Sequence, residues 1–182
     1  MQDREGVKRL CRVLAMLALA GMAAVPLVTL TVWWFPQLLS DEVYATLGGS
    51  NVDPAALLAL GPLQRITGML VLLTGSGLQM AALWFLRRTF LEGAEGRWFS
   101  LAAVRNFRRF AWLSLVIVAV SVVQDSALSV ITTIHLPPGQ QMLVLSFGSN
   151  DFQRLFTGLV MLFVAHIFAA GREVDEENAS FI

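Results

Sequence analysis

The sequence predicts an all-α fold: a four-transmembrane-helix bundle with a short interfacial helix in the first outer loop. Of the 182 residues, 56% are hydrophobic and 14% are charged, whereas soluble domains carry about a quarter charged residues. Mean hydropathy is +0.66. Four apolar stretches approach the roughly 20 residues that a helix needs to cross a hydrocarbon core of about 30 Å. They cover approximately residues 10–35, 66–86, 110–130 and 152–170, within one domain of residues 1–182.

The first stretch is predicted to remain as a helix in the mature protein. Lys8, Arg9 and Arg12 form a basic region before the apolar run. A cleaved signal peptide is the alternative, because Ala18-Leu19-Ala20 resembles a cleavage site. The apolar run nevertheless continues for fifteen residues beyond Ala20, and a secretory core is only about 7 to 15 residues long. The length therefore favours a transmembrane helix.

The distribution of basic residues predicts the orientation of the helices. Eleven of the thirteen Lys and Arg residues lie in the amino-terminal segment, in the loop between the second and third stretches, and in the tail. Only Arg65 and Arg154 lie on the other side. Because cytoplasmic loops are enriched in Lys and Arg, both termini and the central basic loop are expected in the cytoplasm.

The first outer loop is predicted to contain a short helix at the membrane surface. Asp53 is a good N-cap, Pro54 suits the first helical position, and Gly61-Pro62 should end the helix. The residues between them are mostly apolar: Ala55, Ala56, Leu57, Leu58 and Leu60. In the second outer loop, a turn at residues 137–139 precedes residues 142–147, which could form either a strand or a shallow membrane contact.

The central loop is predicted to present a basic face. Ser100 can cap a helix that runs into the third stretch. Arg105 and Arg109 are four residues apart and Arg108 lies beside them, so all three share one helical face at the depth of the lipid headgroups. This face suits anionic lipids, with a cytosolic partner as the alternative. The acidic tail is a second candidate partner contact, through Glu173, Asp175, Glu176 and Glu177.

Three polar residues fall within or near the apolar stretches. Asp125 lies sixteen residues after Arg109, or roughly 24 Å at 1.5 Å per residue. We predict an outer ion pair of Asp125 with Arg154 or Arg65. Gln79 is expected in a helix-packing seam and His166 as a neutral, hydrogen-bonded packing residue. A small transporter or channel subunit is the alternative, and it requires Asp125, Gln79 and His166 to line one water-accessible path.

No catalytic, cofactor-binding or metal site is predicted. His135 and His166 are expected on opposite sides of the bilayer, so they cannot share a metal or haem. Cys11 is the single cysteine, and the chain has no phosphate loop, nucleophile elbow or metalloprotease motif. The formal net charge is zero, so direct nucleic-acid binding is not expected. These observations predict a protein that is not an enzyme.

Two stretches resemble a known family. They are Phe90–Phe99, which leads to Asn106–Arg109, and the tail Ile167–Ile182. Both look like the bacterial four-helix integral membrane family catalogued as domain of unknown function two-nine-seven-five, whose members resemble this chain over nearly its whole length. The resemblance implies a bacterial inner-membrane location and, in some members, a neighbouring small helix-turn-helix regulator. It implies no activity.

We therefore expect an uncharacterised inner-membrane protein that acts as a non-enzymatic regulator or adaptor. It would act through its basic cytoplasmic loop and its acidic tail. Its expected partners are anionic lipid headgroups and, from the resemblance, a small cytosolic helix-turn-helix regulator. The alternative is a small transporter or channel subunit, and a membrane enzyme is a third hypothesis.

Overall fold

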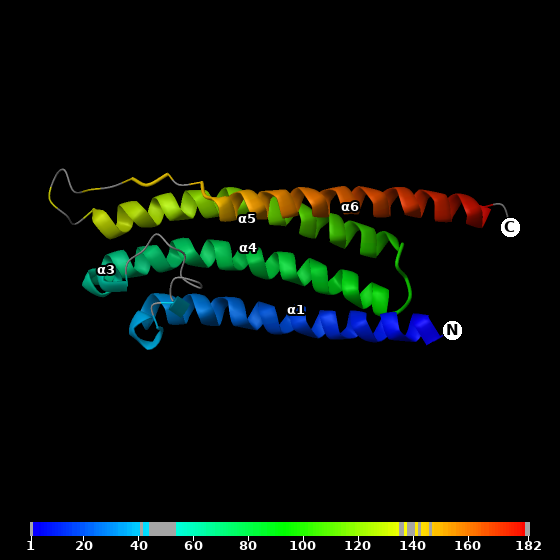
Figure 1. The fold of residues 1–182 in the computed structure, drawn as a ribbon, viewed down its shortest axis with the longest axis horizontal. Coiled ribbons are helices and arrows are strands. Elements are labelled where there is room, and N and C mark those ends of the chain that lie inside the picture. Colours follow the sequence, from blue (N-terminus) through cyan, green and yellow to red (C-terminus); the bar gives the residue numbers. More distant parts are fainter. Residues whose placement is uncertain are drawn as a thin grey trace.

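Four long helices, each antiparallel to the next in chain order, make up a computed structural model of the protein (Figure 1). The structure describes residues 2–40, 42–43, 54–134, 137, 141, 143–145 and 147–180. The long helices are α1 (Gln2–Trp34), α4 (Pro62–Ala94), α5 (Leu101–Thr133) and α6 (Ser149–Ser180). All four are long and apolar enough to cross a membrane, and the described residues form no strand. The predicted all-α fold is confirmed.

The surface of these helices is strongly apolar. Met16, Leu70, Val123, Phe156 and Phe163 each expose more than half of their surface. Soluble monomers rarely expose contiguous apolar patches larger than a few hundred Å². The exposed side chains are therefore suited to lipid, in agreement with the low content of charge.

The helices pack in chain order. Extensive interfaces join α1 to α4, α4 to α5, and α5 to α6, and within the described residues α1 and α6 share no comparable interface. Glycines allow close approach in two of these interfaces: a Cβ on Gly68 would overlap the Trp33 ring, and one on Gly158 would lie 2.7 Å from Leu115 Cδ2. Small residues at such points let transmembrane helices pack closely.

Two short helices lie at the end of the molecule opposite the termini, namely η1 (Pro36–Leu38) and α3 (Pro54–Ala59). The predicted short helix is therefore present and begins at Pro54, while its predicted cap, Asp53, lies outside the described residues. Leu57 and Leu60 were expected at the membrane surface, yet both are buried in a core cluster with Trp33. The reason is that these two side chains share one apolar cluster with Trp33 of α1 and Met69 of α4, which covers this side of α3.

The connection between α5 and α6 has no regular structure in the residues that are described there. Of the two predicted alternatives for residues 142–147, the strand is not formed by the described ones. Leu143, Leu145 and Phe147 are exposed, and the Val144 backbone N–H donates to Ser129 Oγ over 3.0 Å. Most of the predicted turn at residues 137–139 lies outside the described residues.

Both termini and the α4–α5 connection lie at one end of the molecule (Figure 1). We call this end the loop end. It contains the segments that hold eleven of the thirteen Lys and Arg residues. The candidate functional residues of the sequence analysis therefore divide into two groups, one at the loop end and one nearer the opposite end.

Candidate functional site at the loop end

Helix α4 ends in a hydrogen-bonded turn of defined geometry. Gly96 has a φ of +82°, its N–H donates to the Gly93 carbonyl over 3.0 Å, and the Arg97 N–H donates to the Glu92 carbonyl over 3.0 Å. These two bonds are the Schellman motif, in which a glycine in the left-handed conformation closes a helix. The motif fixes the direction of the chain after α4.

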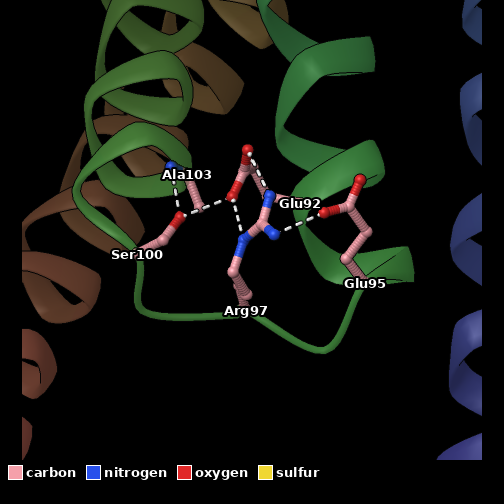
Figure 2. A network of polar contacts seen from close by, with 5 residues as sticks. All are labelled: Glu92, Glu95, Arg97, Ser100 and Ala103. Carbon is pink, nitrogen blue, oxygen red and sulfur yellow. Dashed lines mark hydrogen bonds and ion pairs between the residues drawn. The ribbon is translucent and has the colours of Figure 1, made fainter.

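A network of side chains then fixes the connection to α5 (Figure 2). Arg97 binds Glu92 through two bonds of 3.0 and 3.2 Å and forms an ion pair with Glu95 at 2.5 Å. Ser100 Oγ lies 2.9 Å from the same Glu92 carboxylate and accepts the Ala103 N–H over 3.1 Å. The predicted cap of α5 by Ser100 is therefore confirmed. We call Glu92–Ser100 the fixed loop.

The positive charge of Arg97 is compensated within this network. Its hydrogen bond to Glu92, followed by the negative charges of Glu92 and Glu95, raises the pKa of the Arg97 guanidinium above its ordinary value. Arg97 counts toward the basic loop by sequence, but two carboxylates compensate it in the structure. It therefore contributes little to the positive field of the loop end.

Gly93 and Phe99 bring the fixed loop against the two terminal helices. Trp98 packs on Gly93, where a Cβ would lie 2.8 Å from the ring and 3.2 Å from Cys11 Sγ of α1. Phe99 packs on α6, with its ring 6.1 Å from that of Phe168 in an edge-on arrangement. The fixed loop thus contacts both α1 and α6, although those two helices share no extensive interface. The sequence analysis missed these contacts. Two large aromatic residues, Trp98 and Phe99, close to Gly93 and Gly96 could have indicated that the loop packs against other helices.

The three predicted basic-face residues, Arg105, Arg108 and Arg109, lie on one exposed side of α5. Together with Phe85 of α4, they line an open groove of about 770 Å³. The Arg109 guanidinium lies 5.3 Å from the centre of the Phe85 ring. Among the described residues, no ion pair involves any of the three arginines. The structure therefore groups the three arginines on one face of α5, and no described carboxylate compensates their charge.

The acidic tail belongs to the last turns of α6. Glu173 is exposed. Asp175, Glu176 and Glu177 are helical, since α6 continues to Ser180, but their side chains lie outside the described ones. The helix extends ten residues beyond Ala170, the predicted end of the fourth span.

The predicted outer ion pair of Asp125 with Arg154 or Arg65 is not among the ion pairs of the described residues. Arg154 instead forms an ion pair with Asp151, one turn away on α6, at 3.7 Å. Arg65 donates two hydrogen bonds to the Leu57 carbonyl and lies over the Trp34 ring. Asp125 is within electrostatic range of Asp151 and Arg154 but forms no ion pair. Arg154 and Arg65 are thus held by Asp151 and by the Leu57 carbonyl, respectively.

The polar residues at membrane depth do not share one cavity. Gln79 lines a groove of about 360 Å³, together with Thr29, Ser76 and Gln124. Neither Asp125 nor His166 belongs to its lining, and His166 Nδ1 lies 2.8 Å from the Leu162 carbonyl of its own helix. Sequence reasoning missed Gln124, whose amide donates to the Val71 carbonyl and packs on Gly75. The sequence feature that could have indicated this contact is the amide of Gln124 in one apolar helix together with Gly75 in the neighbouring one.

The described part of the chain contains no candidate metal site, meaning a group of three or more His, Cys, Asp or Glu residues placed to hold a metal ion. His135 lies outside that part. Cys11 is a free, buried thiol. Its sulfur lies close to Gly93 of the fixed loop, which is the environment of a packing residue.

Comparison with known proteins identifies the family. Residues 52–182 match the family model described as protein of unknown function (DUF2975). The match covers more than half of the chain, including the fixed loop, the arginines of α5 and the acidic tail. The chain belongs to this family. The predicted resemblance is thereby confirmed, and no curated protein and no solved structure matches.

Membership of the DUF2975 family adds no activity, because the family has none assigned. Together with the four membrane-length helices, it describes an uncharacterised multi-pass membrane protein. The matched residues begin before α3 and leave α1 outside. The features of the loop end that the family match includes are therefore those on α4, α5 and α6.

Proposed function

We propose that the chain is a non-enzymatic regulator or adaptor of the bacterial inner membrane that holds a cytosolic protein at its loop end. Both termini and the loop end would face the cytoplasm, because this end carries eleven of the thirteen basic residues and positive charge is retained on that side. The basic α4–α5 loop and the acidic tail of α6 would form the contact. A small helix-turn-helix regulator is the partner that the family resemblance suggests.

The observation that carries this proposal is the continuation of α6 to Ser180. Ten helical residues beyond the predicted span correspond to about 15 Å at 1.5 Å per residue, which is enough to project past the headgroups. This projecting segment carries four carboxylates: Glu173, Asp175, Glu176 and Glu177. An acidic helix standing out from the membrane would be repelled by an anionic lipid surface. A basic surface on a soluble protein is the more favourable contact.

The rigidity of the fixed loop also favours the loop end as the docking site. Its ion pairs and cap hold the α4–α5 connection in one geometry, and Phe99 ties α6 to it. A partner would thus meet a preorganised surface, which lowers the entropic cost of binding.

Photocrosslinking from position 173 in intact cells tests the proposal. We expect a photoreactive residue in place of Glu173 to crosslink one soluble protein, and the crosslink to disappear when Asp175, Glu176 and Glu177 are changed to Asn, Gln and Gln. Position 63 is the matched control, because Leu63 is highly exposed at the opposite end of the molecule. A second control, D3N/E5Q, removes negative charge from α1 at the loop end.

Identical crosslinks from positions 173 and 63 would contradict the proposal. So would a crosslink that survives neutralisation of the tail, since the contact would then not depend on the carboxylates. Loss of the crosslink in D3N/E5Q as well would show a general charge effect.

A small transporter or channel subunit is the second candidate, and the groove around Gln79 is the observation that favours it. Thr29, Ser76, Gln79 and Gln124 bring four polar side chains to one groove at membrane depth. Accessibility of a cysteine at position 79 tests this function in a Cys11→Ala background. Transport predicts that Q79C reacts with a water-soluble thiol reagent while V123C, on an exposed apolar face, does not. An unreactive Q79C would exclude this path.

A further inference from the structure

The groove beside the three arginines of α5 is polar at one end and apolar at the other. Arg105, Arg108 and Arg109 line the part nearer the fixed loop, where Leu101 is the one apolar lining residue of α5, and Trp112 and Val116 line the part farther along the helix. Val116 is seven residues beyond Arg109, or about 10 Å deeper along the axis at 1.5 Å per residue. Phe85 of α4 forms part of the opposite wall. We call this site the arginine groove.

The polar and apolar parts of the groove lie at the depths of the lipid headgroups and of the hydrocarbon, respectively. In the sequence-based assignment, Phe110 is the inner boundary of the third span, so the arginines lie at headgroup level and the apolar part lies in the hydrocarbon. Arginines at that level attract anionic headgroups, at about 1 kcal/mol per residue. Trp112 and Val116 are both exposed, so the apolar part is open to an acyl chain.

The charge of the groove is available to a ligand. Within the described residues, the carboxylates nearest in sequence, Glu92 and Glu95, are bound to Arg97, and no ion pair involves the groove arginines. The Arg109 guanidinium lies over the Phe85 ring, and this cation–π contact holds it across the groove. Arginine presents two N–H groups side by side, which fits the oxygens of a phosphate.

We infer that the arginine groove binds one anionic phospholipid, with its phosphate on Arg105, Arg108 and Arg109 and one acyl chain along Phe85, Trp112 and Val116. A groove of about 770 Å³ is within the range of roughly 300 to 1,000 Å³ that is usual for ligand sites. A free phosphate ion would use the arginines but leave the apolar part uncovered. The inference does not rest on the proposed function, because lipid binding needs no cytosolic protein and the crosslinking test of the proposed function depends on the tail of α6.

Native mass spectrometry of the full chain in detergent tests the inference. Phosphatidylglycerol and phosphatidylcholine with identical acyl chains are titrated separately, and glycerol 3-phosphate serves as the soluble phosphate. We expect phosphatidylglycerol to bind with a stoichiometry of one and with clear preference over phosphatidylcholine. The variant R105Q/R108Q/R109Q should lose that preference, with affinity falling on the order of 100-fold if each arginine contributes about 1 kcal/mol.

The control variant R4Q/R9Q/R12Q removes three positive charges from α1 at the same end of the molecule. Its affinity for phosphatidylglycerol should stay within about threefold of the parent, a difference of less than 1 kcal/mol. Equal losses in the two triple variants would overturn the inference, because binding would then follow total charge. A glycerol 3-phosphate affinity equal to that of the lipid would overturn it as well.

A second variant, Val116→Trp, keeps every charge and fills the apolar part of the groove. It should weaken phosphatidylglycerol binding about tenfold while leaving any binding of glycerol 3-phosphate unchanged. Circular dichroism establishes that each variant retains its helices. If the triple variant does not fold, V116W decides the question, and unchanged lipid binding in V116W would refute the acyl-chain contact.

Discussion

The fixed loop and the arginine groove are adjacent in sequence, yet they use arginine in opposite ways. Arg97 lies in a network with Glu92 and Glu95 that ends one helix and begins the next. Arg105, Arg108 and Arg109 follow on α5 within the next twelve residues and form no ion pair in the described part of the chain. The charge of Arg97 stabilises the connection between two helices. The charges of the three groove arginines have no described partner within the chain, so they can interact with a ligand.

This difference indicates how the loop end is organised. The fixed loop lies against α1 at Gly93, beside Cys11, and against α6 through Phe99, so it sets the positions of the helix ends. The groove depends on those positions because Phe85 and the arginines come from different helices. Changes in the fixed loop should therefore alter stability, and changes in the groove should alter ligand binding.

Among changes in the fixed loop, Gly93→Ala is expected to have the largest effect on stability. The added Cβ would lie 2.8 Å from Trp98 and 3.2 Å from Cys11 Sγ, and overpacking of this kind costs about 1–3 kcal/mol. Gly77→Ala is the matched control, because a Cβ there meets no atom within 4 Å, and it should stabilise the helix by about 0.5–1 kcal/mol. Unfolding of both variants in detergent by circular dichroism is the measurement. Equal stability of the two would contradict the packing described for Trp98.

A smaller effect is expected for Gly96→Ala. Its φ of +82° lies in the left-handed region, which costs an L-residue about 1–2 kcal/mol. A Cβ there would be 3.4 Å from Lys8 Cε, an ordinary contact, so the cost comes from the backbone alone. Gly6→Ala serves as the control, since its Cβ would be in open space. If Gly96→Ala unfolds at the same denaturant concentration as the parent, the turn is not held as described.

The fold could be predicted from the sequence because lipid imposes a simple rule. A helix must be long and apolar enough to cross the hydrocarbon, and four stretches of the chain meet that condition. The cap at Ser100 could be predicted too, since it depends on residues three positions apart. The burial of Leu57 could not, because it depends on how α3 folds back on Trp33.

The candidate site was predictable only in part. The grouping of Arg105, Arg108 and Arg109 follows from helical spacing alone. The pairing of Arg97 with Glu92, by contrast, depends on the left-handed turn at Gly96, which brings the Arg97 side chain back to the helix end. The ion pair predicted for Asp125 does not occur among the described residues, and it depends on the rotation of α5 relative to α6, which sequence spacing does not give.

Ser100→Ala should cost about 1 kcal/mol, as is typical for the loss of an N-cap. The Ala103 N–H would lose its acceptor, and Glu92 would lose one of its partners. Ser114→Ala is the control, because Ser114 Oγ donates only to the Phe110 carbonyl one turn back on α5. Hydrogen exchange of the first turn of α5 should increase in the first variant and stay unchanged in the second. Equal exchange in both would contradict the capping role.

Arg108→Gln should have the smallest effect on stability, within about 0.5 kcal/mol, as for surface positions without a special contact. Its side chain is exposed and forms no ion pair with a described residue, so the folded chain loses no partner. The same change removes one of three charges from the arginine groove, and binding of phosphatidylglycerol should fall by about fivefold, or roughly 1 kcal/mol. Measuring the unfolding and the phosphatidylglycerol affinity of the same preparation separates the effect on stability from the effect on binding. A variant that loses stability and lipid binding in parallel would mean that Arg108 supports the fold as Arg97 does, and the contrast between the two regions would then fail.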